Sequence, residues 1–308
     1  SLPVLPPLHI GLFARQAQLG AGGYAAIDAM VKGVAPNAGL QHLLAWRFLF
    51  GALIALAVFR AQKRPIPSWE SVRFHTVRGL LQLAGAGTFF YALMHLPLAV
   101  ATIIGFTAAL MVPFVAWALM RERVSPIALI ATVIGFAGAV FAVTGRPQSG
   151  AVSEHWMLGV VSCFVAAFLY ALILVMLRMR ATKEDATTIA MFTNLVPAIA
   201  MLPVTFGLFG AVDWRDIPIF LMFGIFGYAV WYLMTLAYAR APAQRLAPLE
   251  YTALIWSGIF GSIFFAEYPG WQTWVGAAII IAACLIVAFE ERFVTRKETG
   301  LPVSDLPE

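Results

Sequence analysis

The chain consists of long apolar runs separated by short polar intervals. About twenty consecutive apolar residues are enough to cross the hydrocarbon layer of a bilayer as a helix. The pattern predicts ten such helices, at residues 10–31, 40–59, 74–94, 98–120, 126–144, 156–177, 187–209, 217–238, 243–265 and 270–289. The links between them are too short to hold a soluble domain. We therefore predict an all-α integral membrane protein with ten transmembrane helices.

Composition supports the membrane assignment. Hydrophobic residues make up 61% of the 308 positions and charged residues only 11%, whereas soluble domains carry about 25% charged residues. The two cysteines, Cys163 and Cys284, lie in apolar runs and form no metal-binding or redox spacing. We expect no metal and no cofactor.

The basic residues are distributed unevenly between the predicted loops. With the N-terminus in the cytoplasm, sixteen Lys and Arg residues fall on the cytoplasmic side and three, Lys32, Arg146 and Arg215, on the outer side. This positive-inside bias predicts that both termini are cytoplasmic. The same bias explains the net charge of +5 without a nucleic-acid partner, so the expected partners are the lipid bilayer and a small-molecule solute.

The two halves of the chain repeat each other. A shift of 145 residues places Glu122 on Glu267, and a shift of 146 places Tyr24 on Tyr170. Each half contains five predicted helices, an odd number, so the second half must enter the membrane inverted. Inverted repeats with a solute site near the midplane, at their interface, are a transporter architecture.

These boundaries define one membrane domain over residues 1–308. The first five-helix repeat is predicted at 10–145 and the second, inverted repeat at 154–290. Residues 291–308 are polar and are expected to form a disordered cytoplasmic tail.

Several motifs resemble the drug/metabolite transporter superfamily, of the ten-helix EamA type. They are "AWRF" in the second span and a Glu just past the fourth and ninth spans, followed by the Gly- and Ala-rich helices in "RERVSPIALIATVIGFAGAV" and "AEYPGWQTWVGAAIIIAACL". The segment "APLEYTALIW" resembles one branch of the family, which carries A-P-x-E-Y. The resemblance implies a multi-pass exporter of small metabolites in the bacterial inner membrane that works by alternating access.

The resemblance leaves the solute open. Amphiphilic metabolites, first of all amino acids including aromatic ones, are the leading prediction, and flat cationic drugs or quaternary amines are the alternative. An intramembrane enzyme is a distant third reading. The five histidines lie at or near span ends, and no nucleophile–base pair occurs within a span, so no catalytic residue is expected. The chain also shows no ATP-binding domain.

Aromatic residues form a stripe in the eighth predicted span. Tyr228, Trp231, Tyr232 and Thr235 are spaced i, i+3, i+4 and i+7, on one face of a helix. Either this face packs against a neighbouring helix, or it forms a cavity wall that stacks on flat or cationic solutes.

Four further residues are candidates for the solute site. Tyr24 and Tyr170 occupy equivalent places in the two repeats, and they either line the two gates or record common ancestry. Glu250, followed by Tyr251, is a lone carboxylate in an apolar segment. It either meets the ammonium of a solute or a proton in the cavity, or bonds a hydroxyl of a neighbouring helix.

Other charged residues are predicted to be structural or gating. Arg47 is expected to hold the outer half together by pairing with Asp28 or with backbone carbonyls. Asp28 also lies one turn before Lys32, a spacing that favours an i,i+4 ion pair. Glu122 and Glu267, at equivalent positions of the repeats, are expected to close the repeat ends.

Overall fold

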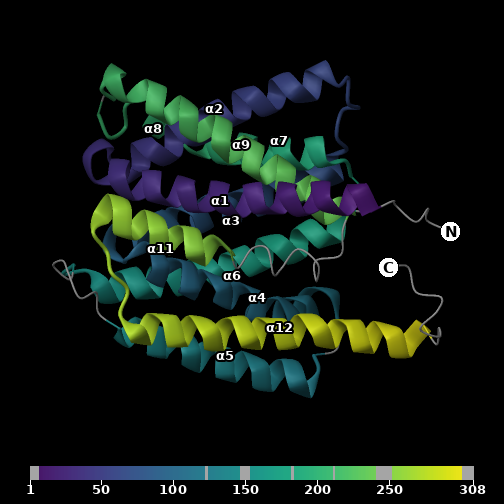
Figure 1. The fold of residues 1–308 in the computed structure, drawn as a ribbon. Coiled ribbons are helices and arrows are strands. Elements are labelled where there is room, and N and C mark those ends of the chain that lie inside the picture. The colour runs from purple at the N-terminus through teal and green to yellow at the C-terminus, as the bar shows by residue number, and fades with distance from the viewer. Residues whose placement is uncertain are drawn as a thin grey trace.

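The computed structural model describes residues 7–121, 124–145, 153–181, 184–210, 212–240 and 252–299. Within these ranges the side chains are described except at 7–21, 24, 181, 234–240 and 289–299. All secondary structure in this part of the chain is helical (Figure 1). The elements are α1 (Pro7–Ala38), α2 (Leu40–Ala61), α3 (Trp69–His95), α4 (Leu98–Met120), α5 (Pro126–Thr144), α6 (Trp156–Ala181), α7 (Ala186–Ala200), α8 (Leu202–Thr205), the 3-10 helix η1 (Trp214–Asp216), α9 (Ile217–Arg240), α11 (Thr252–Phe265) and α12 (Trp271–Thr299).

The protein is a multi-pass membrane protein. Among the described residues, six helices are long and apolar enough to cross a bilayer, and α7 and α11 are shorter apolar helices. The outer face of α5 exposes a row of large aliphatic side chains, which suits a surface that faces lipid. These side chains are Ile127, Leu129, Ile130, Val133, Ile134 and Val140.

Polar caps mark several of the helix starts. The hydroxyls of Ser68 and Ser125 each accept a hydrogen bond from the backbone N–H three residues later, at the starts of α3 and α5. The carboxylate of Asp185 accepts two backbone N–H groups in the first turn of α7. Each cap supplies acceptors for N–H groups that have no partner within the helix.

Helix α1 ends at Ala38 rather than 31 and α3 begins at Trp69 rather than 74, and two other predicted boundaries are further off. The helix expected at 187–209 ends at Ala200, and only the short α8 follows. Pro203 explains the break, because its ring would clash with the carbonyl of Ile199 and it has no N–H to donate. At the other boundary, α12 continues to Thr299, so 291–299 is helical rather than disordered. This stretch is rich in Glu, Arg and Lys, which favour helix.

The helices pack in a layered bundle. Figure 1 shows α5 beside α12 along one edge and α2, α7 and α9 along the opposite edge, with α1, α3, α4, α6 and α11 between them. In the middle layer, α3 packs on α6 and α7, α1 packs on α9 and α11, and α4 packs on α5, α6 and α11. The start of α1 and the end of α12 lie at the same end of the bundle.

Two glycines allow helices to approach closely. A Cβ on Gly224 of α9 would lie 2.5 Å from the Cβ of Phe50 on α2. A Cβ on Gly79 of α3 would likewise lie 2.5 Å from the Cβ of Val196 on α7. Both distances are far below van der Waals contact, so each interface requires glycine at this position.

Candidate functional site

The aromatic stripe of α9 divides between two neighbours. The rings of Tyr228 and Tyr232 stack with their centroids 5.7 Å apart and lie among side chains of α2 and α7. Trp231 instead faces Tyr170 of α6, with ring centroids 6.1 Å apart in an edge-to-face arrangement. Trp231 is 8% exposed in the middle of its helix, so it is not an interfacial anchor.

The Tyr170–Trp231 pair joins two helices whose main packing partners differ. Helix α6 packs on α3 and α4, whereas α9 packs on α2 and α1. The two rings therefore meet across the interior of the bundle. Edge-to-face aromatic pairs leave ring faces that can stack on a flat solute.

The remaining solute-site candidates fall outside the described structure. Glu250 and Tyr251 lie outside the described residues, as does Glu122 among the structural candidates. Tyr24 and Thr235 lie in α1 and α9, and their side chains are outside the described part.

Arg47 is buried at the meeting point of four helices. Its side chain is 6% exposed, and its guanidinium carbon lies 4.4 Å from the ring centroid of Phe48 and 5.5 Å from that of Phe90 on α3. Gly227 of α9 makes room for it, because a Cβ there would lie 3.2 Å from two guanidinium nitrogens. Asp28 of α1 lies within electrostatic range of Arg47. Gly227 lies one helical turn before Trp231 on α9.

Lys32 of α1 and Glu267, in the link between α11 and α12, form a clamp through their ion pair and their bonds to the backbone around the start of α4. The Lys32 Nζ lies 2.5 Å from Glu267 Oε1 and also donates to the backbone carbonyl of Leu96. Glu267 Oε2 accepts the backbone N–H of Leu98, at the start of α4, at 2.9 Å. The ion pair of Lys32 is thus with Glu267, and the i,i+4 pair with Asp28 that the spacing favoured is not formed between these two described side chains.

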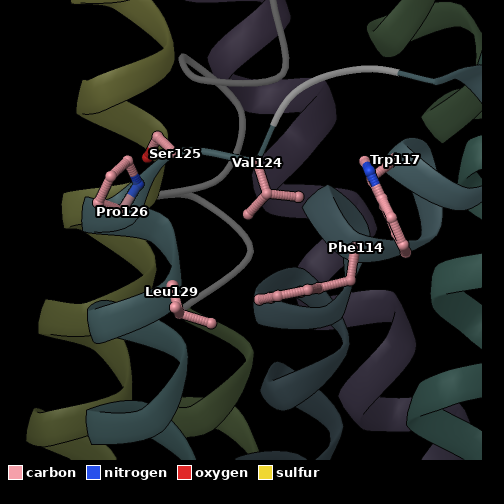
Figure 2. Close-up of a pocket in the computed structure, with 6 residues that line it drawn as sticks. All are labelled: Phe114, Trp117, Val124, Ser125, Pro126 and Leu129. Atoms are coloured by element: carbon pink, nitrogen blue, oxygen red, sulfur yellow. The ribbon is translucent and has the colours of Figure 1, made fainter.

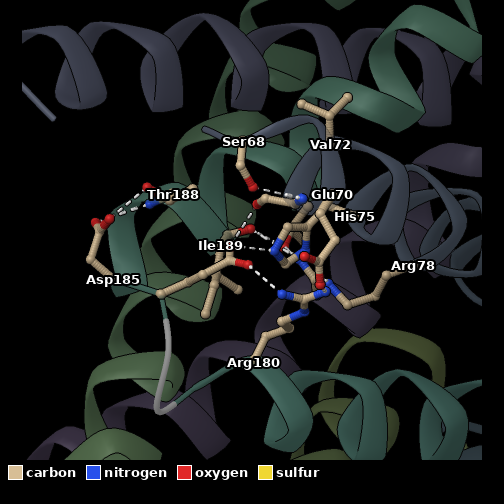
Figure 3. A network of polar contacts seen from close by, with 12 residues as sticks. Ser68, Glu70, Val72, His75, Arg78, Arg180, Asp185, Thr188 and Ile189 are labelled. Atoms are coloured by element: carbon tan, nitrogen blue, oxygen red, sulfur yellow. Dashed lines mark hydrogen bonds and ion pairs between the residues drawn. The ribbon is translucent and has the colours of Figure 1, made fainter. Parts of the chain in front are cut away.

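A polar network lies at the beginning of α3 (Figure 3). His75 Nε2 lies 2.8 Å from Glu184 Oε2, and the Nε–H of Arg78 donates to His75 Nδ1 at 3.1 Å. Arg78 also donates to the carbonyl of Ile189 at 3.0 Å and to the hydroxyl of Thr193 at 2.6 Å. Both His75 and Arg78 are 0% exposed. The sequence carried one signal for this network, the i,i+3 spacing of His75 and Arg78 in a mostly apolar helix.

A pocket of about 560 Å³ opens at the turn between α4 and α5 (Figure 2). Five of its six lining side chains are apolar or aromatic, with one serine that already caps α5. The pocket is lined by Phe114, Trp117, Val124, Ser125, Pro126 and Leu129. None of these residues belongs to the aromatic pair or to the charged positions above. Among the described residues, no group of three His, Cys, Asp or Glu side chains could hold a metal ion.

Comparison with protein families identifies both halves of the chain. The family model described as the EamA-like transporter family matches residues 17–144 and again residues 157–289. The two matches together cover most of the chain.

Curated relatives are named as transporters. The chain is 25% identical over 266 residues to a protein of Rickettsia felis named S-adenosylmethionine uptake transporter, covering 86% of this chain and 88% of the relative. It is 27% identical over 281 residues to a protein of Brucella anthropi named riboflavin transporter, covering 89% of this chain and 97% of the relative. A solved crystal structure also matches, with a TM-score of 0.60 and 19% identity, over 92% of this chain and 97% of that one.

Proposed function

The chain belongs to the EamA-like transporter family, and on that premise we propose that it carries a small solute with a flat heteroaromatic ring across the membrane. The observation that carries this proposal is the Tyr170–Trp231 pair, which brings two aromatic side chains together inside the bundle from different parts of the chain. The proposed solute stacks on these rings, and the buried charge of Arg47 fixes its polar end.

The names of the relatives support this solute class. S-adenosylmethionine and riboflavin both contain a fused nitrogen heteroaromatic ring attached to a hydroxylated chain or sugar. S-adenosylmethionine also carries a sulfonium cation, which agrees with the flat cationic class predicted as the alternative. The export of amino acids predicted from the sequence has no support among these relatives, because one is named for uptake and neither for an amino acid.

Alternating access between two inverted five-helix repeats is the proposed mechanism. The family model matches each half separately, which supports a duplication. Helix packing agrees with an approximate two-fold relation: α3 packs on α6 and α7, and its proposed counterpart α9 packs on α1 and α2. The pair α4 with α6 likewise has its counterpart in α11 with α1.

The glycine contacts give finer support for the repeats. Gly224 lies 145 positions after Gly79, and Val196 lies 146 positions after Phe50. Gly79 meets Val196 between α3 and α7, and Gly224 meets Phe50 between α9 and α2, both with a projected Cβ distance of 2.5 Å. The same two shifts that align the sequence halves therefore also align two helix contacts.

We place the protein in the bacterial plasma membrane with both termini in the cytoplasm, on the strength of the charge bias. The topology can be tested with single cysteines at two exposed positions, Ile66 and Glu154. In intact cells, Glu154→Cys should react with a membrane-impermeant maleimide and Ile66→Cys should react only after lysis. The reverse pattern would refute this orientation.

The solute proposal can be tested by counterflow in proteoliposomes that contain the purified full-length chain. Labelled S-adenosylmethionine and riboflavin are the two probes, and phenylalanine represents the amino-acid prediction. We expect exchange of at least one heteroaromatic probe above protein-free liposomes, and no exchange of phenylalanine. Exchange of phenylalanine alone, or of none of the three, would contradict the proposed solute class.

A further inference from the structure

The imidazole of His75 has both nitrogens engaged, and its partners fix its protonation state. Arg78 carries only donors, so the Nδ1 of His75 must accept and cannot hold a proton while this 3.1 Å bond exists. The ring proton therefore sits on Nε2 and points at the Glu184 carboxylate 2.8 Å away. The ring itself is held by stacking on Phe192 of α7, with centroids 5.1 Å apart and planes 11° apart.

The charges around His75 balance only when its ring is neutral. Arg78 comes from α3, Arg180 from α6 and Glu184 from the turn before α7. Glu70, at the start of α3, pairs with Arg180 at 2.6 Å. Among the described residues, this cluster thus holds two cations and two anions, with Glu70 at its exposed edge. The nearby Asp185 does not change this balance, because it caps α7 and pairs with Arg64 of the loop after α2, 3.5 Å away.

A proton on His75 would compete with Arg78 for one atom. The only free valence of the neutral ring is the Nδ1 lone pair, which the Nε–H of Arg78 now occupies. Protonation there breaks this bond and places two cations side by side in a buried site, where their repulsion is poorly screened. Arg78 is also the residue that bonds α3 to α7, through Ile189 and Thr193. The same proton strengthens the contact of His75 with Glu184, because that contact becomes a full ion pair.

The network spans the two matched halves of the chain. Helix α3 lies in the first family match, and Glu184 and α7 lie in the second. Any motion of one half against the other must therefore move His75 or Arg78 relative to its partners. Glu184 is 13% exposed and gives water a way to the buried ring.

We propose that His75 is the proton-binding site of this transporter, and that protonation at Nδ1 is coupled to the separation of α3 from α7. This inference rests on the proposed transport function. The proton enters from water at the face of the membrane where α3 begins, and it displaces the Arg78 N–H from Nδ1. By linkage, a conformation in which Arg78 no longer bridges α3 and α7 binds the proton more tightly. A proton gradient then biases the two conformations and drives the solute.

The test uses a variant that mimics the neutral ring. In His75→Gln the amide N–H can still donate to Glu184 and the amide oxygen can still accept from Arg78, but no proton can be taken up. His155→Gln, which changes an exposed histidine at the opposite end of the bundle, is the matched control. Counterflow of S-adenosylmethionine and riboflavin is measured in proteoliposomes from about pH 7.5 to about pH 4.5, an interval that starts above the ordinary pKa of histidine and extends well below it.

We expect wild-type and His155→Gln flux to change about five-fold or more across this interval, because occupancy of a single proton site changes steeply near its pKa. His75→Gln should keep its flux nearly constant. If His75→Gln retains the wild-type pH profile, the proposal is overturned while the transport function stands. If neither probe is transported by any form, the proposed function fails, and a second measurement decides the proton site.

That measurement is NMR of the full-length protein with 15N-labelled histidine, which needs no solute. The signal missing from His75→Gln identifies His75. We expect the Nε2–H tautomer at about pH 7.5 and a growing fraction of doubly protonated ring as the pH falls to about 4.5, because Arg78 and burial oppose the charged ring. A ring that keeps Nδ1 unprotonated throughout would refute the site. If His75→Gln does not fold, Glu184→Gln replaces it: loss of the carboxylate should move the titration to lower pH, and an unmoved titration would count against the site.

Discussion

The clamp between Lys32 and Glu267 offers a test of energetics that is independent of the solute. The two side chains are only 13% and 14% exposed, so each charge depends on the other. Glu267→Gln keeps an oxygen that can accept the Leu98 N–H and removes only the charge. The ammonium of Lys32 then keeps the Leu96 carbonyl and the ring of Phe265, whose centroid lies 5.7 Å away, but no counter-charge. Removing one partner of a buried pair costs about 3–5 kcal/mol, and the partial exposure here favours the lower end, about 3 kcal/mol.

Replacing the other partner of the pair should reduce the free energy of unfolding by less. In Lys32→Met, the Glu267 carboxylate keeps the 2.9 Å bond from Leu98 at the N-terminus of α4, where the helix dipole also favours a negative charge. We expect a loss of about 1–2 kcal/mol from this substitution, since a charged hydrogen bond remains. The double variant should lose less than the sum of the two single losses, with a coupling of about 1–3 kcal/mol.

The assay is a double-mutant cycle on the free energy of unfolding, measured by SDS titration in mixed micelles. Glu154→Gln, which removes an exposed carboxylate near the same end of the bundle, serves as the control and should have no effect. Additive losses in the double variant, or a larger loss in Lys32→Met than in Glu267→Gln, would show that the clamp does not act as this geometry implies.

Three further outcomes are expected. Gly224→Ala places a Cβ 2.5 Å from a side-chain atom of α2 and should lower the free energy of unfolding by about 1–3 kcal/mol in the same SDS titration. Gly105→Ala is the control and should be nearly neutral, because the atom nearest to its new Cβ lies 3.9 Å away. Trp231→Ala should weaken apparent affinity for S-adenosylmethionine and riboflavin about ten-fold in counterflow, while Trp117→Ala, 59% exposed, should leave it unchanged. Glu250→Gln should reduce the flux of cationic S-adenosylmethionine and leave the flux of neutral riboflavin unchanged. If both fluxes keep their wild-type values in this variant, the carboxylate does not discriminate between solutes by charge.

The sequence predicted the positions of most described helices to within a few residues, because apolar runs of membrane length are a local property. The count of ten membrane spans stays a prediction, since six of the described helices are long and apolar enough to cross a bilayer. The sequence analysis missed the break before Pro203, although the proline itself was a sufficient signal that the run from 187 could not continue unbroken. It also missed the helical extension to Thr299, because polar composition alone does not separate a solvated helix from a disordered tail.

Contacts between distant helices were much harder to predict. Lys32 has an acidic residue one turn away, and local spacing favoured that partner, but the fold supplies Glu267 from 235 positions later. His75 and Glu184 are 109 positions apart, and no periodicity links them. The aromatic stripe of α9 was predicted as one face, yet Trp231 and Tyr228 have different neighbours, because a helix in the middle of a bundle is contacted from several sides.

The length of α5 has a consequence for the membrane itself. Its 19 residues span about 28 Å at 1.5 Å per residue, close to the hydrocarbon thickness of about 30 Å. Helix α12, packed alongside, extends well beyond this length. The α5 edge therefore has a hydrophobic height close to the thickness of an average hydrocarbon layer. Lipids with longer acyl chains must compress beside α5, so this edge of the bundle should favour lipids of moderate chain length.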